Sequence, residues 1–172
     1  MKTGTPHPQD VTAAVHDPLL HGDGTAVVDP FSLYRISTAH TPRAARLRES
    51  VRQGALRLVT PAVAFAIACG MRTCWDENCG QEHRPGTNTP ASRFQGLDGV
   101  EIADLTYAEL VSAGQLFARC ADHRITGAEV LAACHCVLLS LSLGAPLVSA
   151  ARAAYCYRAL PEAQANGAIE LV

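Results

Sequence analysis

The chain alternates between short aliphatic runs and longer stretches in which apolar residues recur at helical spacing. The aliphatic runs predict strands at residues 26–28, 56–59, 100–103, 146–149 and 169–172. The longer stretches predict helices at residues 31–38, 42–54, 62–72, 106–120, 126–144 and 151–160. Because strands alternate with helices, we expect an α/β fold, with three layers in the order α/β/α around a central, mainly parallel sheet of about four to five strands.

Capping signals mark the starts of three of these helices. Thr60 is a candidate N-cap for the helix that follows the second strand. Thr106 and Glu109 have the spacing of a capping box, and Thr126 and Glu129 repeat it. The second box places Glu129 at the head of a strongly apolar helix, which we expect to be largely buried.

The pattern predicts one domain with two irregular segments. Residues 1–24 contain prolines and glycines without an apolar period and predict a flexible N-terminal arm. Residues 25–172 are expected to form a single domain, because a chain of 172 residues suits one core. Residues 73–97 within that domain also lack an apolar period and are predicted to be a long loop.

Composition and charge limit the cellular setting and the partners. The first ten residues lack the apolar stretch of an export signal, and the apolar run at residues 62–69 is too short to cross a bilayer, so we expect a cytoplasmic protein without membrane contact. Seven cysteines in such a chain indicate reduced thiols. The formal net charge of -2 gives no general attraction to RNA, which would need a local basic patch.

One stretch of the chain is dense in arginines and is the candidate basic patch. Helical spacing would present several of them on one strip, although a solvated helix face explains the same pattern. No aromatic residues interleave with these arginines to stack on bases. The residues are Arg43, Arg46, Arg48, Arg52 and Arg57, of which Arg43, Arg46 and Arg52 are the candidate RNA contacts.

A second candidate site is a group of zinc-ligand residue types. Cys69, Cys74, Cys79 and His83 are separated by four, four and three intervening residues and offer three thiolates and an imidazole. The alternative is a core thiol at Cys69 and two loop thiols. The run from Cys134 to Cys136 is not a metal site, because neighbouring helix positions point in different directions, and we expect its central residue, His135, to be a satisfied core histidine.

Several short phrases resemble actinobacterial PIN domains of the toxin type. They are Ala26 to Asp29, Leu58 to Ala62, Ala132 to His135 and Gly144 to Ser149, and the resemblance covers about residues 25–172. It implies a ribonuclease that depends on magnesium or manganese and is paired with a small antitoxin protein. The family places acidic residues at the carboxyl ends of neighbouring strands, because hard divalent ions need converging oxygen ligands.

The resemblance also implies that this acidic site is largely missing. Asp29 matches the first family acid, and its alternative role is to accept hydrogen bonds from backbone groups at the strand-to-helix turn. Ile67 stands at the second position and Ala151 at the fourth. The third lies shortly before His135, where the nearest carboxylate, Glu129, is also explained by capping.

We therefore expect a PIN-like domain that has lost nuclease activity and binds a protein or RNA without needing a cofactor. The protein partner would be a small antitoxin-like or regulatory protein, and a homodimer is left open. The first alternative is a weak ribonuclease that holds magnesium or manganese with Asp29, Glu129 and either Asp104 or Glu101. The second alternative is a small zinc-binding interaction module that uses the cysteine and histidine group.

Overall fold

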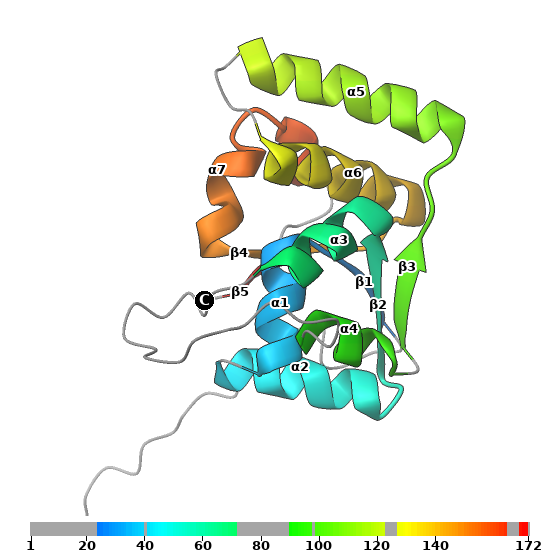
Figure 1. The fold of residues 1–172 in the computed structure, drawn as a ribbon, viewed down its shortest axis with the longest axis vertical. Helices are drawn as coiled ribbons and strands as arrows, with labels where there is room; N and C mark the ends of the chain where they lie inside the picture. The colour runs from blue at the N-terminus through cyan, green and yellow to red at the C-terminus, as the bar shows by residue number, and fades with distance from the viewer. Residues whose placement is uncertain are drawn as a thin grey trace, which may run out of the picture.

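The computed structural model describes residues 24–39, 41–71, 90–97, 99–122, 127–164 and 169–171. These residues form a three-layer α/β/α fold around a five-stranded sheet with the order β3-β2-β1-β4-β5 (Figure 1). Every neighbouring pair of strands is parallel, so the predicted fold class is confirmed. The strands are β1 (Gly24–Val28), β2 (Leu56–Pro61), β3 (Val100–Ala103), β4 (Leu147–Ala150) and β5 (Ile169–Leu171).

Helices fill the connections between the parallel strands. The long ones are α1 (Pro30–Thr38), α2 (Pro42–Arg52), α3 (Ala62–Gly70), α5 (Tyr107–Asp122) and α6 (Ala128–Leu143). The short ones are α4 (Pro90–Gln95), α7 (Ala154–Tyr157) and two 3-10 turns, η2 (Ala151–Ala153) and η3 (Pro161–Gln164). No helix within these described stretches combines the length and the apolarity that crossing a membrane requires.

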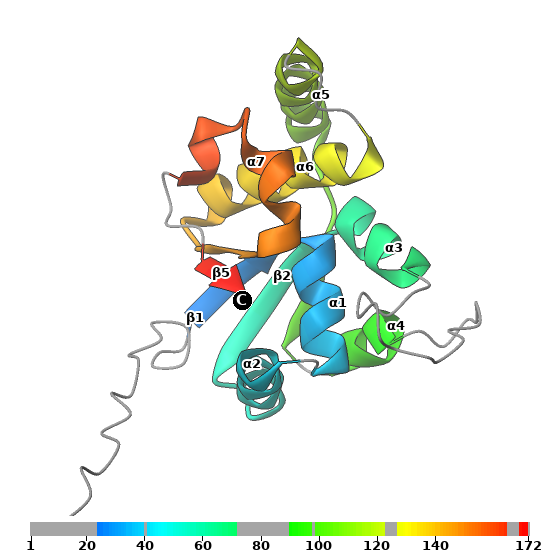
Figure 2. The ribbon, with the colours of Figure 1, turned by 90° about the vertical axis from the view of Figure 1, so that its left-hand side faces the viewer.

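The sheet separates two apolar cores, because successive strand residues point to opposite faces. On one face Val27 and its neighbours pack against α6, with α5 and α7 nearby. On the other face Val28 and its neighbours pack against α1, α2 and α4. Helix α3 contributes to both cores, with Ala64 in the first and Ala68 in the second. Figure 2 shows α6 and α7 on one side of the strands and α1, α2 and α4 on the other.

The capping signals have mixed outcomes. The Thr106 box is confirmed, because the Thr106 backbone N–H donates to Glu109 Oε2 at 2.7 Å and the Glu109 N–H donates to the Thr106 hydroxyl at 3.3 Å. Thr60 is not an N-cap. It is still part of β2, and its hydroxyl donates across the sheet to the Val28 carbonyl at 3.1 Å.

Several predicted element bounds also need correction. The buried helix α6 begins after Gly127, which caps it without a side-chain hydrogen bond, and not after Thr126, which lies outside the described residues. The predicted helix at 151–160 is shorter, a 3-10 turn followed by α7. Within the predicted loop at 73–97, residues 90–95 form α4, which buries just Ala91 and Phe94 and is too short to give an apolar period. Residues 73–89 and the arm up to residue 23 lie outside the described residues.

Candidate functional site

Asp29 lies at the carboxyl end of the central strand β1, where it begins α1. Pro30 takes the first helical position, and the Ser32 backbone N–H donates to Asp29 Oδ1 at 2.7 Å. The other carboxylate oxygen, Oδ2, accepts the Tyr157 hydroxyl at 3.2 Å. Asp29 is 1% exposed. The capping role is therefore confirmed, and both carboxylate oxygens already have protein donors.

The backbone next to Asp29 is tied to two neighbouring elements. The Val28 carbonyl accepts the Thr60 hydroxyl from β2, and at 3.7 Å it also accepts the Cys136 thiol from α6. Both lone pairs of this carbonyl are thus engaged inside the protein. These two contacts join β1 to β2 and to α6 at the carboxyl edge of the sheet, which is where a metal site between the strands would lie.

Burial decides the electrostatics of this site. It raises the pKa of the Asp29 carboxyl, against the lowering effect of the hydrogen bond from the Ser32 N–H. Burial, with the nearby charge of Asp29, also holds the pKa of the Cys136 thiol and of the Tyr157 hydroxyl well above their usual ranges. A bound cation needs an ionised and reachable carboxylate, so the observed surroundings of Asp29 do not fit magnesium or manganese.

The other candidate carboxylates lie on separate elements. Glu129 is half-buried in the first turn of α6. Glu101 is exposed on β3 and forms an ion pair with Arg57, and Asp104 is exposed after the end of β3. Among the described residues, no three or more His, Cys, Asp or Glu side chains are grouped so that they could hold a metal ion.

The two positions at which the resemblance would place further acids serve the fold or face solvent. Ile67 is half-buried on α3 and packs against the core that contains α6. Ala151 is exposed at the start of η2, directly after β4. A glutamate at position 67 would lose part of this apolar packing, because burying a carboxylate there is unfavourable.

The cysteine candidates are split between described and undescribed parts of the chain. Cys69 is half-buried and packs against the core that contains α1 and α2, whereas Cys74, Cys79 and His83 lie outside the described residues. The zinc site therefore stays a prediction. His135 is buried as expected, and its Nδ1 has no hydrogen-bond partner within the described part of the chain, so the expectation of a satisfied histidine does not hold for this nitrogen. Burial lowers its pKa.

No protein-family model matches this chain, and no curated protein matches it significantly. The resemblance to PIN domains therefore remains a prediction from the phrases that carry it. Tyr157 is the site residue that sequence reasoning missed. It lies 128 positions after Asp29, and its own surroundings in the sequence give no sign of the contact.

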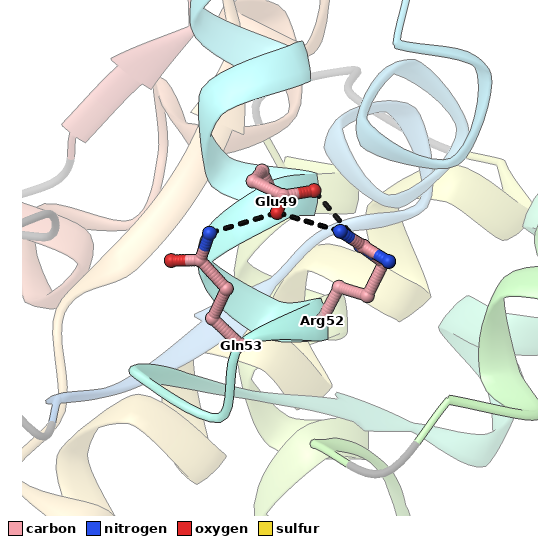
Figure 3. Close-up of polar contacts among 3 residues, drawn as sticks. All are labelled: Glu49, Arg52 and Gln53. Carbon is pink, nitrogen blue, oxygen red and sulfur yellow. Dashed lines mark hydrogen bonds and ion pairs between the residues drawn. The ribbon is translucent and has the colours of Figure 1, made fainter.

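Two side chains of the arginine stretch, Arg52 and Arg57, form ion pairs with described residues. Arg52 donates from two nitrogens to Glu49, each at 2.9 Å, and Gln53 donates to the same carboxylate (Figure 3). Arg57 is occupied by its ion pair with Glu101. Arg46 is exposed on α2, and Arg43 is half-buried on the same helix. Arg52 is thus partly neutralised, which weakens it as a contact for RNA.

Proposed function

We propose that this chain is a PIN-like domain without nuclease chemistry, which acts by binding a partner. The observation that carries the proposal is the state of Asp29, the one acid that clearly matches the family. Its carboxylate is 1% exposed and both of its oxygens accept hydrogen bonds from protein donors. Further support comes from the parallel sheet, whose strand β1 ends at this acid, as the resemblance implies.

The chemistry of the donor set explains why cleavage would be lost. Hydrolysis of RNA by metal ions needs several carboxylates that converge on the ions, because magnesium keeps most of its waters and needs charge to compensate its partial dehydration. In this structure Asp29 Oδ2 accepts a hydrogen bond from the Tyr157 hydroxyl, at the place where a metal ion would have to bind. Ile67 and Ala151 supply no negative charge that could help to hold such an ion. The scaffold and its surfaces remain, and these can serve RNA or a small regulatory protein.

A cleavage assay tests the proposal directly. Purified protein incubated with single-stranded RNA and manganese is expected to cut no faster than the Asp29→Ala and Asp29→Asn variants, because Asp29 is buried and its oxygens already accept hydrogen bonds. The measurement is the loss of full-length RNA on a denaturing gel, with circular dichroism to show that each variant is folded. Cleavage by the wild type that both folded variants lack would establish the weak ribonuclease in place of this proposal.

A further inference from the structure

A pocket of about 440 Å³ lies between α1, α2 and α4, away from Asp29. Its walls include Ser37 and Thr38 from the last turn of α1, Arg48 from α2, and Arg93 from α4. Pro90 and Leu97, which are half-buried, contribute an apolar surface. The volume lies in the range of small-molecule sites, roughly 300–1,000 Å³.

The two arginines give the pocket a positive charge that the other described residues lining it do not cancel. Both side chains are exposed, and neither forms an ion pair with any described residue. None of the described residues that line the pocket is acidic. Arg48 and Arg93 come from different helices and line the same pocket, and each guanidinium group has the planar pair of donors that matches a phosphate.

The wall formed by α1 offers hydrogen-bond acceptors. The hydroxyls of Ser37 and Thr38 donate to the Tyr34 carbonyl at 2.7 and 3.0 Å, so their lone pairs remain to accept. Cations on one side and acceptors on the other suit a ligand that has a phosphate and also donates hydrogen bonds. Sugar hydroxyls are such donors, and the apolar surface at Pro90 and Leu97 suits a base.

We propose that this pocket binds a nucleotide phosphate, either in a free ribonucleotide or in single-stranded RNA. The inference rests on the proposed binding function, for which it names the ligand class. The proposed loss of nuclease activity depends on Asp29, whereas the proposed ligand site depends on Arg48 and Arg93. Either proposal can therefore be wrong while the other is right.

Binding measurements with matched arginine variants test this inference. Calorimetry with adenosine 5′-monophosphate and with inorganic phosphate, and fluorescence anisotropy with a labelled single-stranded oligoribonucleotide, would be run on the wild type, Arg48→Ala, Arg93→Ala and Arg158→Ala. The last variant is the control, because Arg158 is also a charged and exposed arginine but follows α7, away from the pocket. We expect Arg48→Ala and Arg93→Ala each to weaken binding about tenfold or more, because each removes hydrogen bonds to a charged group.

The three probes separate the two sources of the phosphate. Binding of the monophosphate that competes with RNA indicates a pocket that accepts both, and binding of RNA alone indicates the polymer. For RNA, each lost phosphate contact should also reduce the slope of log affinity against log salt by about 0.7.

Three results would overturn the inference. These are no binding of any probe to the wild type at millimolar concentration, an equal loss in Arg158→Ala, and inorganic phosphate binding as tightly as the nucleotide. RNA cleavage in the manganese assay with an intact Arg48 effect would instead overturn the proposed function alone.

Discussion

Replacing Asp29 with alanine is expected to lower the free energy of unfolding by about 2–4 kcal/mol near pH 4. The substitution removes the N-cap of α1, which contributes about 1 kcal/mol. It also leaves the hydroxyl of the half-buried Tyr157 without its acceptor, which costs about 1–3 kcal/mol. Urea denaturation of both proteins measures the difference. A change below about 0.5 kcal/mol would contradict the capping role, since that is the scale of neutral surface substitutions.

The Asp29→Asn variant is expected to differ from the wild type in how its stability depends on pH. The folded-state pKa of Asp29 is raised above the ordinary value of 3.8, so the folded protein binds the proton more tightly than the unfolded chain does. Stability is therefore greatest below that value and falls as pH rises through the folded-state pKa. Asp29→Asn keeps the shape and an acceptor for Ser32 but has no charge to bury.

We expect wild type and Asp29→Asn to have similar stability near pH 4 and the variant to become the more stable protein toward pH 7. Thermal unfolding at a series of pH values measures this. A metal site would behave in the opposite way, because a bound cation lowers a carboxylate pKa and manganese would raise the melting temperature of the wild type alone. That outcome would return Asp29 to a catalytic role.

Replacing Gly99 with alanine is expected to destabilise the protein by about 2–4 kcal/mol, because it combines backbone strain with overpacking. Gly99 has a φ of +114°, which residues with a side chain rarely adopt. An added Cβ would also lie 3.3 Å from the Leu56 carbonyl oxygen and from two atoms of Val51. The Gly99 carbonyl accepts the Leu58 N–H at 2.7 Å, so the strain acts where β3 joins β2. Chemical denaturation measures the loss.

Gly114→Ala is the matched control for Gly99→Ala. Gly114 lies inside α5, and an added Cβ there would have no atom within 4 Å. Because alanine is the better helix former, this variant is expected to gain about 0.5–1 kcal/mol. Equal losses in both variants would show that the backbone of Gly99 is not the cause.

The sheet could be predicted from sequence because each strand is an aliphatic run between turn signals. Parallel order also followed, since each connection contains a helix. The exact ends of the helices and strands could not be predicted, because they depend on hydrogen-bond partners that are distant in the sequence. Thr60 has the residue type of an N-cap, yet the Val28 carbonyl on the neighbouring strand takes its hydroxyl. Local propensity is overridden there by a contact across 32 positions.

The position of the candidate site could be predicted from the sequence, but whether Asp29 caps a helix or binds a metal ion could not. The sequence predicts Asp29 at the end of a buried strand, and the structure confirms this position. From the sequence alone, capping and metal binding are equal alternatives for this residue. The deciding facts are the burial of Asp29 and its contact with Tyr157, and both depend on how α7 packs. The pocket with Arg93 was missed for a similar reason, because α4 lies in a segment whose pattern predicts a loop.

Helix α5 stands apart from the rest of the fold, because it packs mainly against α6 and lies on the outer side of that helix (Figures 1 and 2). Its inner side is apolar, but Tyr107 is 82% exposed and Leu110 is 49% exposed. Detaching α5 would disturb one helix face and leave every strand pairing intact. We therefore expect α5 to open locally more readily than the sheet, at the cost of exposing its own contribution to the core, Leu116 and Cys120.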